Sequence, residues 1–488
     1  MPKKARDLPF PALAIDPEAG RPLHRQIYFA LREAILEGRL KPGARLPASR
    51  ALAGDLGVSR NTVMSAFEQL RAEGYIDGRV GAGSFITRHL PEETPRAQPP
   101  AAGRPKPSLR RRISARGAML VGLRGRSSLP RPFSPGLPEL DQFPFREWAR
   151  LLARRWRRPQ RSFLVGGEPG GYRPLCEAIA EYLAMARAVF CRADQVIITS
   201  GAQQALDLCA RVLIDPGDPV WMEEPGYRPT SAVLRAAGAR VVPVPIDDEG
   251  LSVTAGREIE PAPRLICVSP SHQYPLGITM TLPRRLGLLD FARAVDGVVI
   301  EDDYDSEYRY AGRPLAALQG LDGDGRVIYL GTMSKVMFPG LRIGYMVVPE
   351  DLVDVFLAVR AMVDAHPSSI AQAALADFIT EGFLGAHIRR MRQLYAERQA
   401  ALIAAFNQRF GDRLGLAPAA AGMHLVARLA PGTDDRAIAL RATEAGVETP
   451  ALSNYYQGEP ELSGLLLGYA GVDKPELERA STRLAQVL

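Results

Sequence analysis

A lysine that follows an apolar run is the most informative reactive group in this sequence. Lys335 ends the stretch Gly331-Thr332-Met333-Ser334-Lys335, which comes directly after the apolar run Val327-Ile328-Tyr329-Leu330. A lysine amine at the end of a buried strand can form an imine with an aldehyde, given a suitable pocket. Arg342 follows seven residues later and could bind a phosphate with both arms of its guanidinium group. Taken alone the pair is a weak signal, because surface lysines are far commoner than reactive ones.

A group of acidic residues follows another apolar run. The segment Glu301-Asp302-Asp303-Tyr304 comes directly after Val298-Val299-Ile300. A carboxylate that lies against a pyridine nitrogen keeps the nitrogen protonated and electron-withdrawing. Paired acids buried without such a partner would be costly. The segment therefore adds weight to the lysine motif.

Two further motifs have the pattern of a strand that turns into a helix. In Thr199-Ser200-Gly201-Ala202-Gln203, the first-turn amides and the Gln203 side chain could hold a phosphate at the helix N-terminus. In Glu223-Glu224-Pro225-Gly226-Tyr227, the tyrosine could stack on an aromatic ring. Each motif alone is equally well explained by an ordinary turn. Four such turns in this order disfavour that explanation.

The elements that must position these residues are short strands that alternate with longer helices. From about Pro132 onwards, β-rich runs of four residues or so separate helical stretches, which predicts a mostly parallel, buried sheet in an α/β domain of about 350 residues. The predicted strands include Val196–Thr199, Pro219–Met222, Leu265–Val268, Val298–Ile300 and Val327–Leu330.

The N-terminal region has the pattern of a helix-turn-helix. A helix is expected over about 23–37, and a second over about 49–56 precedes the turn at Gly57. Ser59 is a suitable N-cap for the next helix, whose exposed first turn would meet base edges and phosphates. The glycine-rich stretch 78–85 predicts a hairpin, the wing. An unrelated three-helix bundle with a polar cap is the alternative. The residues predicted to contact DNA are Arg45, Ser49, Arg50, Ser59, Arg60, Asn61, Thr62, Gly81 and Gly83.

The charge is distributed unevenly along the chain. Residues 1–130 carry 23 Lys and Arg against 11 Asp and Glu, a net charge of +12, whereas the remainder has a net charge of −5. A basic front end suggests a polyanion as partner, although charge alone does not separate DNA from RNA or membrane. Between residues 91 and 107 there are six prolines, followed by Arg110-Arg111-Arg112. This composition predicts an extended linker.

Composition also sets limits on location and chemistry. No apolar run reaches the roughly 18–20 residues that a membrane helix needs, and the N-terminus does not look like a secretory signal. The four cysteines form no CxxC pair, which fits a reducing cytoplasm. No metal site is expected.

These motifs together resemble a known combination of domains. Residues 12–88 resemble the winged helix of GntR-type regulators, on Gly38–Gly43, Leu46-Pro47 and Glu68–Tyr75. The region from about Phe133 to the C-terminus resembles the fold-type I aminotransferases, and the tandem arrangement resembles the MocR-type regulators. The expected fold class is α/β, a winged helix-turn-helix (12–88) joined by a linker (89–130) to an aminotransferase-like domain (131–488) with a mostly parallel sheet.

The resemblance implies pyridoxal 5'-phosphate (PLP) as cofactor. It makes Lys335 the lysine of the internal aldimine and the catalytic residue, and Asp302 the partner of the pyridine nitrogen, with Asp303 as the alternative if the register shifts by one. Tyr274 stands where classical aminotransferases place an asparagine, which leaves its cofactor contact open. The cofactor-binding residues so implied are Lys335, Asp302, Tyr304, Tyr227, Gly201, Ala202, Gln203, Arg342 and Tyr274.

One departure from the family bears on function. Many aminotransferases carry an arginine near the C-terminus that binds the substrate carboxylate, and the matching strand here, Gly464–Ala470, has none. Arg436 or Arg441 would serve if the strand is misplaced. We therefore expect a homodimeric regulator that binds double-stranded DNA and senses PLP, an amine or an amino acid through an aldimine. The alternatives are an active aminotransferase with an accessory DNA-binding domain, and a repressor whose large domain is only a dimerisation scaffold.

Overall fold

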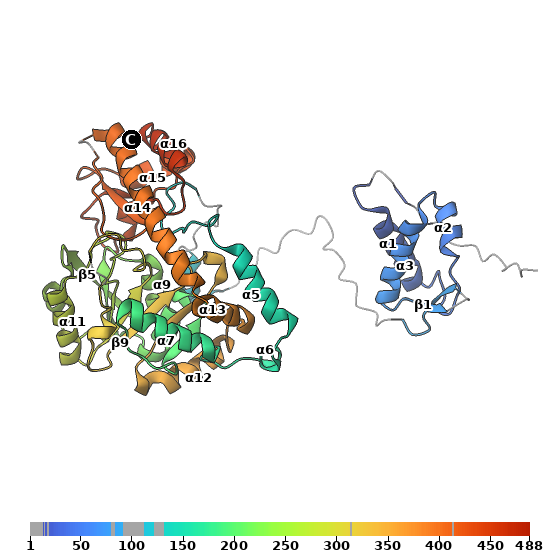
Figure 1. The fold of residues 1–488 in the computed structure, drawn as a ribbon, viewed down its shortest axis with the longest axis horizontal. Coiled ribbons are helices and arrows are strands. Elements are labelled where there is room, and N and C mark those ends of the chain that lie inside the picture. The colour runs from blue at the N-terminus through green and yellow to red at the C-terminus, as the bar shows by residue number, and fades with distance from the viewer. Residues whose placement is uncertain are drawn as a thin grey trace, which may run out of the picture. The chain divides into compact units, whose positions relative to one another are not determined.

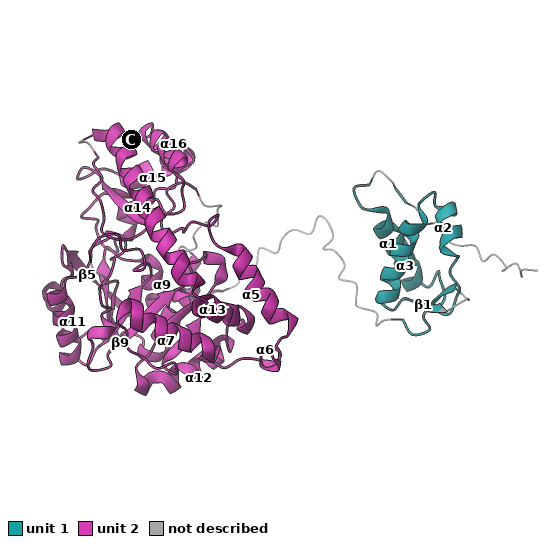
Figure 2. Cartoon of the chain, in the orientation of Figure 1, with its two compact units in different colours: residues 1–111 teal, residues 112–488 magenta. Residues whose placement is uncertain are grey.

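The computed structural model describes most of the chain as two separate compact units. The described residues are 13, 15–16, 19–79, 83–90, 112–121, 131–312, 315–411 and 414–488. The units comprise residues 1–111 and 112–488, which Figure 2 shows in different colours. Among the described helices, none has the length and apolar character needed to span a membrane.

The first unit consists of helices followed by a two-stranded hairpin. Its elements are α1 (Leu23–Leu36), α2 (Ser49–Asp55), α3 (Arg60–Ala72), β1 (Ile76–Arg79) and β2 (Gly83–Ile86). Apolar side chains at helical spacing on α1 and α3, such as Leu31 and Phe67, are buried in one core, as amphipathic helices require. β1 and β2 pair antiparallel, and the Leu46 amide donates to the Ser84 carbonyl at 2.8 Å. The predicted winged helix is therefore confirmed.

An eight-stranded sheet forms the centre of the second unit. Its strands are β3 (Val196–Thr199), β4 (Pro219–Glu224), β5 (Arg240–Asp247), β6 (Gly250–Leu251), β7 (Leu265–Val268), β8 (Val298–Asp303), β9 (Val327–Thr332) and β10 (Gly344–Val347). Their order is β3-β10-β9-β8-β7-β4-β5-β6. β10 runs antiparallel to both neighbours and β6 antiparallel to β5, whereas the other pairs are parallel. This confirms the mostly parallel sheet.

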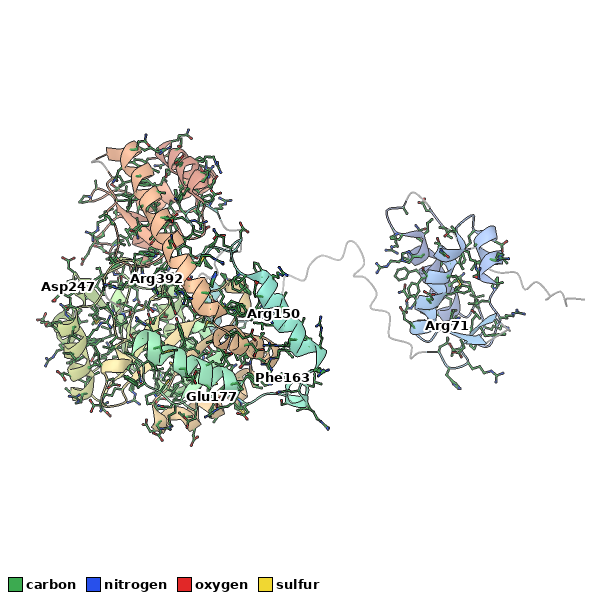
Figure 3. All side chains as sticks on the ribbon, in the orientation of Figure 1. Arg71, Arg150, Phe163, Glu177, Asp247 and Arg392 are labelled. Atoms are coloured by element: carbon green, nitrogen blue, oxygen red, sulfur yellow. The ribbon has the colours of Figure 1, made fainter. Side chains whose placement is uncertain are left out.

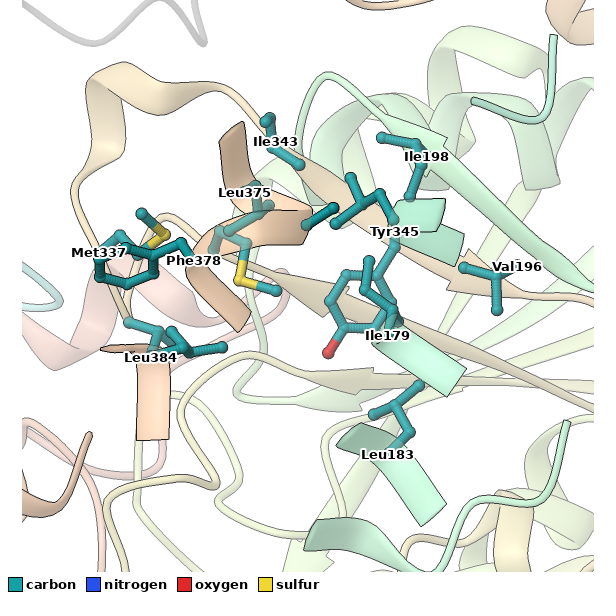
Figure 4. Close-up of a cluster of buried hydrophobic side chains, with 14 of the residues drawn as sticks. Ile179, Leu183, Val196, Ile198, Met337, Ile343, Tyr345, Leu375, Phe378 and Leu384 are labelled. Atoms are coloured by element: carbon teal, nitrogen blue, oxygen red, sulfur yellow. The ribbon is translucent and has the colours of Figure 1, made fainter. Parts of the chain in front are cut away.

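Helices cover both faces of this sheet (Figure 1). They are α5 (Phe145–Arg157), α6 (Arg161–Val165), α7 (Arg173–Arg187), α8 (Ala202–Leu213), α9 (Arg228–Ala237), α10 (Val253–Ile259), α11 (Leu282–Ala294), α12 (Val353–Asp364) and α13 (Ser369–Thr380). Adjacent strand residues point to opposite faces. On β3, Ile198 packs with α7 and α13, and Ile197 packs with α8 and α12. Figure 4 shows the first of these clusters, with Tyr345 and Phe378 among its aromatic members.

A smaller lobe closes the second unit. It contains α14 (Phe383–Phe410), β11 (His424–Arg428), α15 (Asp435–Glu444), β12 (Gly464–Gly468) and α16 (Lys474–Ala485). β11 and β12 pair antiparallel, and their apolar side chains pack with α14 and α16. The Gly468 amide donates to the Phe133 carbonyl at 2.9 Å, and this bond fastens the start of the domain to the lobe.

One helix lies where the sequence predicted only linker. α4 (Ala115–Val121) falls within residues 89–130, belongs to the second unit and contacts α9. None of its side chains is buried. Its sequence, Ala-Arg-Gly-Ala-Met-Leu-Val, lies beyond the proline-rich stretch, which ends at Pro107. Part of the expected linker is therefore helical.

Candidate cofactor site and DNA interface

The residues predicted to do chemistry lie at one edge of the sheet. β3, β4, β8 and β9 share one direction, so their carboxyl ends meet at the same edge, which is where open α/β sheets bind ligands. Gly201 follows β3, Tyr227 follows β4, Asp302 is near the end of β8, and Lys335 comes shortly after β9. Arg342 reaches the same edge because it precedes the antiparallel strand β10.

A cavity of about 290 Å³ opens at this edge. Eight of the nine residues predicted to bind the cofactor line it, and the ninth, Gly201, is adjacent, with Arg342 packed over it. The lining residues are Pro135, Gly136, Ala202, Gln203, Leu206, Tyr227, Tyr274, Asp302, Tyr304, Asp305, Thr332, Ser334, Lys335, Pro339, Arg342 and His424.

The amine of Lys335 is held by a single described hydrogen bond. Its Nζ donates to the Gly136 carbonyl at 2.8 Å. Burial lowers the pKa of Lys335, and the carboxylates of Asp305 and Asp302 oppose part of that shift. A lysine with a depressed pKa supplies more of the neutral amine, which is the nucleophilic form.

Of the two neighbouring aspartates, Asp302 faces the cavity and Asp303 does not. The buried Asp303 carboxylate accepts from Arg187 Nε at 2.8 Å and Tyr329 Oη at 2.6 Å. The Asp302 carboxylate makes no hydrogen bond to any described residue. Burial, and then the nearby Asp303, raises the pKa of Asp302 to about 7, while Lys335 lowers it. The geometry therefore favours Asp302 over its neighbour as the acid that meets a ligand.

Tyr304 belongs to a buried polar network with His272 and Asp305. His272 Nδ1 lies 2.9 Å from Tyr304 Oη and 3.1 Å from Asp305 Oδ2. A carboxylate only accepts, so Nδ1 carries the ring proton and donates it. Burial, and then Asp305, raises the pKa of Tyr304 well above its usual value. The tyrosine hydroxyl thus keeps its proton and can donate into the cavity.

The turn at Gly201 and the neighbouring segment with Arg342 and Gly344 together leave room for an anion. Gly201 caps α8 with φ of 104°, a conformation that favours glycine. Arg342 Nη2 donates to the Ser200 carbonyl at 2.6 Å and lies 3.1 Å from where a Cβ on Gly201 would stand. A Cβ on Gly344 would meet the Gly201 backbone at 2.8 Å. The free amides of the α8 N-terminus and the guanidinium group therefore face one space, as at phosphate sites.

Two tyrosines, Tyr227 and Tyr274, form another wall of the cavity. The rings of Tyr227 and Tyr274 meet edge to face with centroids 5.5 Å apart, and Tyr274 Oη lies 3.0 Å from Tyr455 Oη. Tyr227 remains 40% exposed, so its ring is available to stack on a ligand. Tyr274 does line the cavity, although its hydroxyl already has a tyrosine partner.

Three further residues that line the cavity were not predicted from the sequence. Gly136 comes from the segment before α5, Asp305 lies just beyond the acidic motif, and His424 begins β11. Burial, and then His272, lowers the pKa of His424 to about 4, so it is neutral near pH 7. Only Asp305 had a usable signal, since it directly follows Tyr304 in the sequence.

Neither alternative carboxylate-binding arginine reaches the cavity. Arg436 donates to Asn454 Oδ1 at 3.1 Å, and Arg441 donates to the Val487 carbonyl. On β12 the central position is the buried Leu466. Among the described lining residues, the lysine and arginine side chains are those of Lys335 and Arg342 alone.

The end of α3 that is predicted to read DNA is exposed in the first unit. Ser59 Oγ accepts from the Thr62 amide at 3.1 Å, as predicted for an N-cap. Arg60 and Asn61 are exposed in the first turn, and Arg60 Nε reaches Ser49 Oγ at 3.4 Å. Side chains at this position of a recognition helix reach base edges and phosphates.

Further basic residues lie beside the wing and on α2. The Arg45 guanidinium lies against Gly83, and Arg50 is exposed on α2. Gly81 is outside the described residues. Arg71, labelled in Figure 3, packs beside Gly78 of the hairpin and shares a hollow of about 220 Å³ with Arg45. Arg71 was not predicted to contact DNA because it lies in the last turn of α3, away from the exposed first turn.

We expect Arg60→Ala and Asn61→Ala to weaken specific DNA binding by about 1–3 kcal/mol each, because each removes a side chain from the reading end of α3. Fluorescence anisotropy at fixed salt measures the change. Arg25→Ala is the matched control, since it removes one exposed positive charge from α1. An equal loss for the control would mean that only net charge matters.

Comparison with known proteins agrees with both units. Residues 134–484 match the model described as "Aminotransferase class I and II", and residues 23–86 match "Bacterial regulatory proteins, gntR family". The "Probable rhizopine catabolism regulatory protein MocR" of Rhizobium meliloti is 45% identical over 94% of this chain and 92% of that protein. The "HTH-type pyridoxine biosynthesis transcriptional regulator PdxR" of Corynebacterium glutamicum is 30% identical over 96% of each chain.

Solved structures resemble the second unit. The α-aminoadipate aminotransferase LysN from Thermus thermophilus, complexed with N-(5'-phosphopyridoxyl)-L-leucine, superposes with a TM-score of 0.68 at 30% identity, over 73% of this chain and 91% of that one. The fold and site thus define a GntR-type DNA-binding unit joined to an aminotransferase-like, PLP-family domain. The chain belongs to the MocR-type transcription regulators. The predicted family, fold class and cofactor class are confirmed, and the regulator is favoured over the enzyme.

Proposed function

We propose that the second unit senses PLP, or an amine that reacts with bound PLP, and that this event changes DNA binding by the first unit. The observation that carries the proposal is the pairing, in one cavity, of a half-buried carboxylate that has no hydrogen-bond partner among the described residues with a lysine of lowered pKa. A buried acid without a partner is costly. A ligand with a positively charged ring nitrogen would remove that cost.

The residues present fit PLP at each of its polar groups. The α8 N-terminus, Gln203 and Arg342 would hold the phosphate, and Asp302 would face the pyridine nitrogen. Tyr304 would donate to the phenolic oxygen, and Tyr227 would stack on the ring. PLP supplies an aldehyde that condenses with amines and a ring that withdraws electrons. The chain itself supplies an amine of lowered pKa at Lys335 and a protonated hydroxyl at Tyr304.

The effector class follows from what the cavity lacks. Lys335 and Arg342, the lysine and the arginine of the described lining, are both committed to PLP, so neither is left to orient the carboxylate of an amino acid. We infer that PLP itself or a simple amine is the signal. The names of the relatives, which mention pyridoxine biosynthesis and rhizopine catabolism, are in keeping with both choices.

We further propose that the protein acts as a cytoplasmic homodimer on paired DNA half-sites. Two linked winged helices gain affinity because the second binds at high effective concentration. Light scattering of the purified protein, alone and with DNA, tests the assembly.

The test of the proposed function is DNA affinity measured with and without ligand. Anisotropy titrations with the duplex upstream of the protein's own coding region are expected to shift at least fivefold when PLP, or PLP with an amine, is added, as allosteric coupling typically gives. A parallel assay follows keto acid release. Unchanged affinity under every condition, or steady turnover at an enzyme-like rate, would contradict the proposal.

A further inference from the structure

A second cavity, of about 500 Å³, lies in the large unit and shares no lining residue with the Lys335 site. Its walls come from the end of α7, the loop 306–312 that follows β8, and the first turns of α14. Arg392 of α14, which is labelled in Figure 3, is one of the residues that line this cavity. Its volume falls within the range of about 300–1,000 Å³ that is usual for small-molecule sites.

Arginines dominate the charge of this cavity, and two of them have no partner among the described residues. Arg187 is fully used by Asp303 and other acceptors, and Arg392 donates from Nε and Nη2 to the Glu307 carbonyl. The side chains of Arg309 and Arg389 make no hydrogen bond or ion pair with any described residue. The Nε of Arg309 is moreover buried without a partner. A buried donor left unsatisfied costs about 1–3 kcal/mol, so it calls for an acceptor that binds there.

Glycines keep the space in front of both free guanidinium groups open. A Cβ on Gly312 would stand 3.4 Å from Arg309 Nη2, and a Cβ on Gly385 would stand 3.5 Å from Arg389 Nη1. Any side chain at these positions would extend into the space that the two arginines border. The cavity is therefore open where its positive charge is concentrated.

The one acidic group in the described wall offsets little of that charge. Glu307 accepts from the Tyr182 hydroxyl at 2.9 Å. Burial, and then Asp303, raises the pKa of Glu307 to about 7, so a large share of it is neutral near physiological pH. The remaining wall includes the apolar side chains of Met185, Leu315 and Ile388.

We propose that this cavity binds a small organic anion with two acidic groups, such as a dicarboxylate or a phosphorylated carboxylic acid. Arg309 and Arg389 would each take one acidic group, since the planar guanidinium fork matches carboxylate and phosphate oxygens. The apolar wall would cover the carbon skeleton between the two groups. The chain thus carries an acidic-ligand site in addition to its PLP site.

Isothermal titration of the full-length, PLP-loaded protein with succinate and with 3-phosphoglycerate tests this assignment. At least one probe is expected to bind, and Arg309→Gln and Arg389→Gln are each expected to weaken it about ten- to a hundredfold, as loss of a charged hydrogen bond implies. Arg146→Gln, on an exposed arginine of α5, is the matched control and should leave affinity unchanged. The visible absorbance of PLP should be the same in all variants.

A second variant covers the case in which an arginine substitution disturbs folding. Gly385→Met fills the cavity from α14, where methionine favours a helix more than glycine does, and should abolish binding. The proposal is overturned if neither probe binds the native protein. It is equally overturned if Gly385→Met and the two cavity-arginine variants bind the probe as tightly as the control.

Discussion

Lys335→Ala is expected to abolish the visible absorbance band of PLP in the purified protein and to remove most of its thermal stabilisation by PLP. At a PLP concentration a hundred times the dissociation constant, binding should stabilise the native protein by about 2.7 kcal/mol. The variant keeps Asp302 and the turn at Gly201 that we propose to hold the phosphate, so a weak residual shift should remain. Absorbance spectra and melting curves with and without PLP measure both effects.

Lys474→Ala is the matched control for this experiment. Lys474 is an exposed lysine at the start of α16 that pairs with Glu397, so its removal should leave band and melting shift unchanged. The DNA measurement completes the test, since the alanine variant should bind DNA equally with and without PLP. A band that persists in the variant would place the reactive amine elsewhere. A normal response of the variant to PLP would leave the large domain as a scaffold only.

The two neighbouring aspartates are expected to respond in opposite ways to the same substitution. Asp303→Asn removes the charge that balances the buried Arg187, and breaking such a pair costs about 3–5 kcal/mol of unfolding free energy. Asp302→Asn removes a carboxylate with no hydrogen-bond partner among the described residues, so it should stabilise the PLP-free protein at neutral pH. Denaturant unfolding of both variants measures the difference. Equal destabilisation by both would contradict the assignment of their roles.

The effect of Asp302→Asn has a defined pH dependence. Burial, and then Asp303, raises the folded-state pKa of Asp302 from 3.8 to about 7. The folded protein therefore holds this proton to higher pH than the unfolded chain, and folding stability falls as pH rises between the two values. Above about pH 4, the free energy of unfolding of the asparagine variant should exceed that of the native protein. The difference should reach on the order of 2–4 kcal/mol at pH 7 and above. The gain is expected to vanish below pH 4.

The sequence was most informative where chemistry and local backbone geometry coincide. Gly201 needs a positive φ, Ser59 caps a helix and Lys335 follows a strand, so each leaves a local pattern. The partner of Lys335 leaves none, because Gly136 lies 199 residues away along the chain and contributes only a carbonyl. His424 and Arg389 likewise reach their cavities through tertiary packing of the small lobe and α14. No spacing rule connects them to the sites they line.

The choice between Asp302 and Asp303 shows the same limit at the scale of one residue. Adjacent residues on a strand point to opposite faces, and the motif alone does not say which face holds the ligand. The answer depends on Arg187, which comes from α7 and occupies Asp303. Which of the two aspartates faces the cavity therefore depends on Arg187, a side chain 116 residues away from Asp303 in the sequence.

The bond between Lys335 and Gly136 also gives the lysine a mechanical role. Two backbone hydrogen bonds hold the residues just before Gly136 to the small lobe. The Gly468 amide donates to the Phe133 carbonyl, and the Glu448 amide donates to the Pro132 carbonyl. The hydrogen bond from the Lys335 amine to the Gly136 carbonyl is a further contact that holds this segment. If an aldehyde condensed with this amine, the bond to Gly136 would be lost, so the atom that binds the ligand would also release one contact of the segment by which the polypeptide enters the domain.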